Sequence, residues 1–197
     1  MRHYYVPQFL LSPWAENTLD VKLEVFRLDL PHLPSSRHAP KYTGYGDDLS
    51  ALSKDAVAGM EKQSIEMLFL KRVDNNAARV RNKLENYGLK SLTGEDRVDW
   101  VRFIMSLRIR QPDIVHMLKQ ESANHLIYTL KDQPQEYEEL ISDNDPPTLE
   151  EWTEKQFPGL VENFGLSFFH KLIDNSYYGN KILRDEMVVM GLTRYSL

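Results

Sequence analysis

Apolar residues dominate the stretch from Thr93 to Arg110, and their pattern predicts a helix buried in the protein core. Its apolar side chains cover too wide an arc for a surface helix: Trp100, Val101, Phe103, Ile104, Met105, Leu107 and Ile109. The polar positions form a narrow stripe: Asp99, Arg102, Ser106 and Arg110. Thr93 is a suitable N-cap, and Pro112 predicts the end of the helix. We therefore expect the other elements to pack around it.

Apolar residues at helical spacing predict further helices on both sides of this one. A long helical region is expected from Ser53 to Tyr87, with Gly88 as its stop and a break left open at Asn75 and Asn76. The helices expected after Pro112 are Asp113 to Lys131, Leu149 to Lys155 and Leu160 to Asp174. An acidic connector, Asp132 to Pro147, has room for one short helix.

The first fifty residues have a different pattern, rich in proline and aromatic side chains. Residues 3–14 are expected to be extended, because Val6 and Ser12 precede prolines, and to dock on the helical body. The alternation in Val21 to Leu28 predicts a strand without an evident partner. Leu30 to Gly46 is predicted to be a long irregular loop, because it contains three prolines and two glycines.

These elements predict a mainly α fold, a multi-helix bundle with an N-terminal docked segment and a small β element. A chain of 197 residues with 42% hydrophobic content can fill one core, so we expect a single domain over residues 1–197. Its parts are an entry segment (1–50), a helical body (51–184) and a tail (185–197).

Composition narrows the class of protein. The chain has no Cys, which excludes disulfides and thiolate chemistry and fits a reducing compartment. Pro7 and Gln8 interrupt the apolar N-terminus, so it does not resemble a signal peptide, and no apolar run approaches the roughly 20 residues of a membrane helix. We therefore expect a soluble cytoplasmic protein without a membrane partner.

Charge is distributed unevenly. Lys71 to Arg110 contains ten basic and five acidic residues, whereas Asp132 to Glu162 contains ten acidic residues and one lysine. These blocks can attract each other within the fold, or the basic block can face a phosphate-bearing partner; we favour the first interpretation. A pI of about 5.7 argues against nucleic-acid binding.

The opening sequence HYYVPQF resembles the HYVPQF signature of a mainly bacterial family of unknown function. The matching residues are His3, Tyr5, Val6, Pro7, Gln8 and Phe9. Tyr4 stands where the family usually has His. The resemblance continues in the acidic residues Glu66 and Asp74 and in the segments 92–97 and 107–112. Family members typically continue into a β-rich part with a Ser-Asp-x-Pro stretch, so the resemblance implies a C-terminally shortened member.

Candidate chemistry is limited to one set of polar residues. A phosphate-ester site would use an imidazole for proton transfer, carboxylates for a cation and guanidinium groups for phosphate charge. The candidate groups are His3, Glu66, Asp74, Arg102 and Arg110. The alternative, which we favour, is an ion-pair network between two helices, because a buried arginine needs a carboxylate partner in any case. His3 and Gln8 are then hydrogen-bonding anchors of the docked segment.

No motif indicates a metal or a cofactor. The six histidines lack metal-binding spacing, and neither a Gly-rich phosphate loop nor a Gly-x-Ser-x-Gly elbow is present. Two functions stay open: a non-catalytic helical scaffold or interaction module, and a hydrolase or nuclease-like enzyme whose site is shared with an absent C-terminal part. The partner is not identified by the sequence, and self-association through an open sheet edge is compatible with it.

Overall fold

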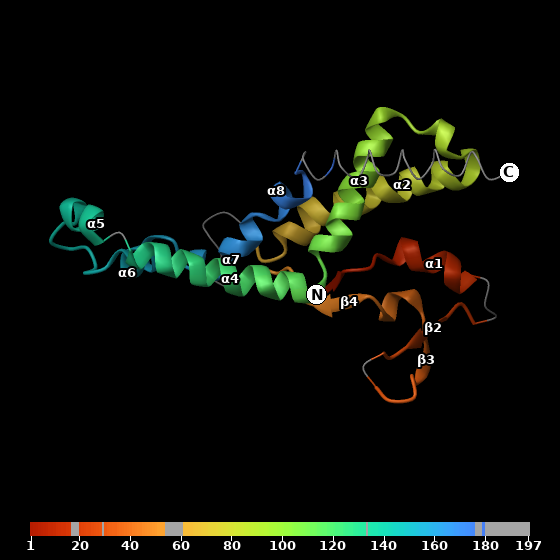
Figure 1. Ribbon diagram of the computed structural model, residues 1–197, viewed down its shortest axis with the longest axis horizontal. Helices are drawn as coiled ribbons and strands as arrows, with labels where there is room; N and C mark the ends of the chain where they lie inside the picture. The colour runs from red at the N-terminus through yellow and green to blue at the C-terminus, as the bar shows by residue number, and fades with distance from the viewer. Residues whose placement is uncertain (17–19, 29, 54–60, 133, 176–178, 180–197) are drawn as a thin grey trace.

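Helices make up most of the computed structural model, which confirms the predicted mainly α class (Figure 1). The structure describes residues 1–197 except 17–19, 29, 54–60, 133, 176–178 and 180–197. The α-helices are α1 (Gln8–Glu16), α2 (Lys71–Tyr87), α3 (Gly94–Ile109), α4 (Pro112–Lys131), α5 (Pro134–Leu140), α6 (Leu149–Gln156), α7 (Leu160–Ser167) and α8 (Phe169–Ile173). The strands are β1 (Arg2–Tyr4), β2 (Leu23–Phe26), β3 (Ser35–His38) and β4 (Tyr45–Asp47). Residues 185–197, predicted to be a tail, lie outside the described residues.

Helix α3 begins and ends where the sequence predicts. Thr93 caps it through a capping box with Asp96, in which each side chain bonds the backbone N–H of the other residue. At its other end, Gln111 leaves helical geometry with a ψ of 140° and Pro112 starts α4. Local sequence signals therefore determine both ends of this element.

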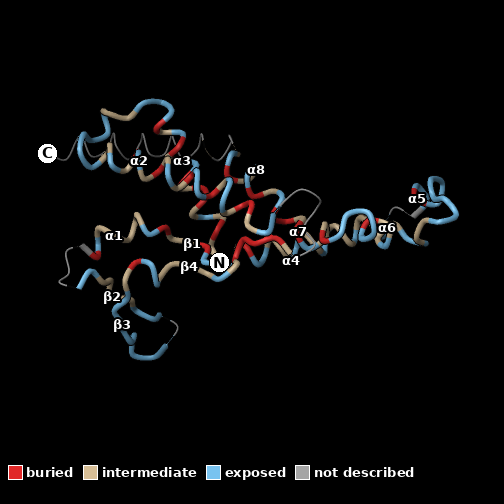
Figure 2. Tube along the Cα trace, turned by 180° about the vertical axis from the view of Figure 1, so that it is seen from behind, coloured by how far each residue is buried: buried red, intermediate tan, exposed pale blue. Residues whose placement is uncertain are grey.

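The core lies under α3, but the helix is not enclosed on all sides as predicted. Val101, Phe103 and Met105 are buried, whereas Trp100 and Leu107 are only partly buried. Helices α2 and α8 pack against α3. In Figure 2, the buried segments gather where the elements meet in the middle of the molecule, and the outer side of α3 faces solvent. The buried hydrophobic cluster there is Leu49, Leu52, Ile65, Leu70, Val101, Met105, Val115, Leu166, Phe169 and Ile173.

The helical region predicted from Ser53 begins later, because Ser53 and residues 61–63 are not helical; residues 54–60 lie outside the described residues. A π-helical segment, η2 (Ile65–Leu70), leads directly into α2, and the break considered at Asn75 and Asn76 is absent. Asn76 instead donates a hydrogen bond to Asp99 of α3, 3.1 Å away. Gly88 ends α2 with a φ of +72°, as expected for a glycine stop.

Helices α4 and α7 form a projecting arm that carries α6 and α5 at its far end (Figure 1). Their backbones are very close at Gly165, where an added Cβ would lie 2.1 Å from the carbonyl oxygen of Leu118. Only glycine fits this contact. The helix predicted from Leu160 to Asp174 is divided at Phe168 into α7 and α8.

The N-terminal segment is not extended as predicted, because α1 occupies most of it. Pro13 lies inside α1 and has no N–H to donate to the carbonyl of Phe9. The guanidinium of Arg81 donates to that carbonyl instead. A contact from α2 therefore satisfies the backbone group that a proline leaves without its helical partner.

The predicted lone strand has a partner within the chain. β2 pairs antiparallel with β3, and β1 pairs antiparallel with β4. The stretch predicted to be an irregular loop contains β3, the 3₁₀ turn η1 (Pro40–Tyr42) and the first two residues of β4. The prediction of an irregular loop is therefore wrong. The strand was missed because β3 has the sequence Ser-Ser-Arg-His, which shows no alternation of apolar and polar residues.

The two charged blocks lie far apart in space. The acidic α5 and α6 stand at the end of the arm, and the basic α2 and α3 lie on the other side of the molecule (Figure 1). In the described part of the chain no ion pair joins the two blocks. The prediction that they attract each other within the fold is therefore wrong. Among the described helices, none is both long enough and apolar enough to span a membrane.

Candidate functional site

Buried and partly buried polar side chains from distant parts of the chain meet beside β1. We call this set the polar cluster; its members are His3, Ser50, Gln63, Glu66, Asp74, Ser106 and Arg110. His3 and Arg110 are each 2% exposed. The cluster brings together four of the five residues predicted for a phosphate-ester site.

Arg110 and Asp74 form the charged centre of the polar cluster. The guanidinium donates two hydrogen bonds to the carboxylate, at 2.7 and 3.0 Å, in the bidentate geometry typical of strong pairs. It also donates to Ser106 Oγ at 3.0 Å and to the carbonyl of Tyr4 at 3.3 Å, and it lies over the ring of Phe103. Only its Nε has no hydrogen-bond partner. The predicted pair between helices is therefore present, and it also holds the backbone of β1.

His3 is held at both ring nitrogens. The backbone N–H of Ser50 can only donate, so Nδ1, 3.0 Å away, accepts from it. Nε2 lies 2.5 Å from Oε1 of Gln63 and donates to it. These contacts fix a neutral ring with its proton on Nε2. Burial also lowers the pKa of His3, which favours the same neutral state.

Glu66 is the member without a cation of its own. Its Oε2 lies 3.4 Å from Ser50 Oγ and 4.0 Å from His3 Nδ1. Burial raises the pKa of Glu66 to about 7, because the desolvation penalty exceeds the favourable effect of Arg110, and Asp74 raises it further. Burial likewise raises the pKa of Asp74 despite its pairing with Arg110. Glu66 therefore gains or loses its proton near neutral pH.

Ser50 and His3 have a spacing that a catalytic pair would use, 2.8 Å from Oγ to Nδ1. The hydroxyl is nevertheless unsuited to attack a substrate. Ser50 is 2% exposed, and its own N–H already uses the lone pair of Nδ1. The arrangement can fasten β1 to the loop after β4 and to η2, and it encloses the Ser50 hydroxyl within the protein.

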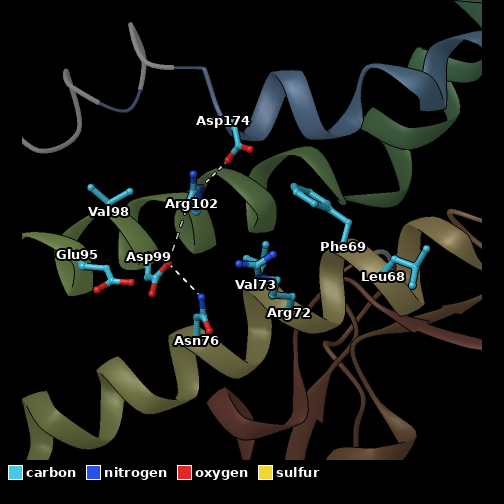
Figure 3. A pocket seen from close by; sticks show the side chains of 10 residues that line it. All are labelled: Leu68, Phe69, Arg72, Val73, Asn76, Glu95, Val98, Asp99, Arg102 and Asp174. Atoms are coloured by element: carbon cyan, nitrogen blue, oxygen red, sulfur yellow. Dashed lines mark hydrogen bonds and ion pairs between the residues drawn. The ribbon is translucent and has the colours of Figure 1, made fainter.

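Arg102 does not join the polar cluster, which contradicts the predicted set. It is eight residues from Arg110, so it lies roughly 12 Å away along the axis and is rotated by about 80°. Its Nε donates to Asp174 at 2.6 Å, and its guanidinium lies 3.8 Å from Asp99 (Figure 3). Arg102 belongs to a separate groove of about 250 Å³ on the outer side of α2 and α3. The groove is lined by Leu68, Phe69, Arg72, Val73, Asn76, Glu95, Val98, Asp99, Arg102 and Asp174.

A second ion-pair network, not predicted from the sequence, joins α2 to the start of α3. Arg79 bridges Asp96 at 2.7 Å and Asp99 at 3.0 Å, and Lys83 reaches Asp96 at 2.7 Å. The hydrogen bond from Lys83 holds the pKa of Asp96 well below its usual range. The sequence predicted Thr93 as the N-cap of this helix, but the partners of Asp96 on α2 carry no motif.

The motif residues at the N-terminus mainly position the chain. Val6 donates its N–H to the carbonyl of Gly44 at 3.0 Å, Pro7 is buried, and Tyr5 and Phe9 pack against the core. Gln8 is exposed at the start of α1, and within the described structure its side chain has no hydrogen bond. The anchoring role predicted for Gln8 is therefore wrong, whereas His3 is anchored as predicted.

Metal ligands do not gather in the polar cluster or elsewhere in the described residues, where no three His, Asp or Glu side chains could hold one ion. A family model described as a protein of unknown function (DUF4238) matches residues 2–189. No curated protein and no solved structure matches the chain.

Proposed function

Because the chain belongs to the DUF4238 family, whose function is unknown, we propose that it is a non-catalytic helical interaction module. The observation that carries this proposal is the closed state of the polar cluster. Its imidazole and its guanidinium are each 98% buried, and hydrogen bonds within the protein occupy both ring nitrogens. The imidazole and the guanidinium therefore stabilise the fold, because a substrate cannot reach them.

Exposed apolar side chains support an interaction role. Leu28, Trp14, Leu68 and Leu140 are each at least 75% exposed, and they lie on different elements. When a partner covers such side chains, the free energy falls by roughly 25 cal/mol per Å² of apolar surface buried. The β2–β3 hairpin is also isolated as a two-stranded sheet, a form of marginal stability without a partner or packing.

One observation favours a second candidate, a hydrolase or nuclease-like enzyme acting on a phosphate ester. His3, Glu66, Asp74 and Arg110 converge as that function requires, and Nε of Arg110 has no partner. A guanidinium with a free donor can bind a phosphate oxygen.

Hydrolysis assays separate the two functions. The purified chain is incubated with a phosphodiester and a phosphomonoester, with and without Mg²⁺ or Mn²⁺, beside Glu66→Gln and the exposed-site control Glu162→Gln. The module predicts no turnover above buffer in any of the three proteins. Turnover in the wild type and in the control that is lost in a folded Glu66→Gln protein would establish the enzyme and refute the module.

Bacterial origin remains a prediction that rests on the resemblance to the HYVPQF signature. The pairing of β2 with β3 gives the predicted lone strand a partner. A cytoplasmic location rests on the absence of cysteine, and the single domain rests on chain length and composition.

A further inference from the structure

The molecule carries opposite charges at its two ends, and these charges do not meet. Residues 71–110, which contain α2 and α3, have a net charge of +5 from ten basic and five acidic residues. Residues 132–155 at the end of the arm have nine carboxyl groups and one lysine, a net charge of −8. Figures 1 and 2 show these regions separated by the length of the arm. Both charges therefore remain available to another molecule.

The end of the arm combines carboxylates with an exposed apolar side chain. Glu138 and Glu139 of α5 are exposed and have no ion-pair partner in the described part of the chain. The next residue, Leu140, is 82% exposed. The only ion pair recorded for the described arm end joins Lys131 to Glu150, at 3.6 Å. We call this surface, Glu138 to Leu140, the arm tip.

The turn between α2 and α3 has the complementary character. Tyr87 is 74% exposed and Leu89 is 42% exposed, and Lys90 is exposed beside them. Neither Lys90 nor Arg97 has an ion-pair partner among the described residues. Glu95 is the exposed carboxylate of this region, whereas Asp96 is buried and already paired with Arg79 and Lys83. We call this surface, Tyr87 to Lys90 with Arg97, the hairpin turn.

We propose that the arm tip of one copy of this chain binds the hairpin turn of a second copy. The proposal rests on the interaction-module function and names its partner. Glu138 and Glu139 pair with Lys90 and Arg97, and Leu140 is covered by the apolar side chains of the turn. Attraction between such opposed surfaces falls with salt, because exposed charges are screened within about 10 Å at 0.1 M. The contact joins different surfaces of identical copies, so it produces an open chain or a closed ring.

Sedimentation velocity of the full chain over a concentration series tests this contact, at about 50 mM and about 500 mM NaCl. The proposal predicts reversible association at low salt that weakens at least about tenfold at high salt. Glu138→Lys/Glu139→Lys and Lys90→Glu/Arg97→Glu are each expected to remain monomeric. An equimolar mixture of the two variants is expected to associate again, because the basic arm tip of the first variant has the opposite charge to the acidic hairpin turn of the second.

The control is Glu121→Lys/Glu162→Lys, which makes the same change of charge on the exposed shaft of the arm. It is expected to associate like the wild type. A wild-type chain that is monomeric at every concentration, or a variant mixture that stays monomeric, would overturn the proposal. These results would leave the non-catalytic function standing, because that function fails only if hydrolysis is found.

Discussion

At the residue scale, the polar cluster shows how a buried arginine organises its neighbours. Arg110 ends α3, and its guanidinium contacts α2, Ser106 and the backbone of β1. A single buried cation with one bidentate carboxylate leaves Glu66 without a counter-charge. Burial, and to a lesser extent the charge of Asp74, raises the pKa of Glu66 even though Arg110 lowers it. The same geometry keeps His3 neutral.

Glu66 makes the stability of the fold depend on pH. Its pKa is about 7 in the folded protein and 4.5 as the ordinary value, so ionisation costs more in the folded state. The contribution of protonated Glu66 to folding stability is fully present below pH 4.5 and is lost as the pH rises through 7. We expect Glu66→Gln to match the wild type near pH 5 and to exceed it near pH 8 by up to roughly 3 kcal/mol. Urea unfolding at both pH values, with Glu162→Gln as control, measures this; equal pH profiles for Glu66→Gln and wild type would contradict it.

At the element scale, the helices whose ends carry local signals were predictable, and the elements that depend on distant contacts were not. Thr93 and Pro112 set the ends of α3 through their own chemistry. Helix α1 was missed because Pro13 normally interrupts a helix, and only Arg81, 68 residues later, compensates for it. β3 was missed because its partner, not its own pattern, makes it a strand.

The site was predictable to a similar extent. A polar stripe on α3 and acidic residues on the preceding helix were sufficient to bring Arg110 to Asp74. Arg102 was wrongly included in the candidate site. It shares the polar stripe of α3 with Arg110, but eight residues separate the two, which is farther along the helix than one side chain reaches. Ser50 and Gln63 could not be predicted, because they contact His3 only through long-range packing of the loop after β4 and η2.

The arm depends on the absence of one side chain. Gly165 of α7 approaches the carbonyl of Leu118 on α4 so closely that an added Cβ would lie 2.1 Å from it, and this neighbour is backbone. Gly165→Ala is expected to separate the helices and to lower the free energy of unfolding by at least about 2 kcal/mol. Gly94→Ala is the matched control, because nothing lies within 4 Å of its added Cβ. Thermal melts compare the two, and equal stability would show that the helices are not in close contact.

At the scale of the whole molecule, the polar cluster connects parts that would otherwise be independent. It ties β1 to the loop after β4, to Gln63 just before η2, and to the pair that joins the start of α2 to the end of α3. The N-terminal strand is short, and its pairing with β4 involves only three residues on each side. Its stability therefore depends on the side chains that fasten it, which gives these buried polar groups a structural role.

Hydrogen–deuterium exchange of residues 1–10 measures this fastening most directly. The account predicts slow exchange of the β1 amides in the wild type. It predicts at least about a tenfold acceleration in His3→Ala, because His3 loses its contacts with Ser50 and Gln63 while the helical body keeps its own protection. Exchange as fast as in an unfolded peptide in the wild type, or unchanged protection in His3→Ala, would contradict the account.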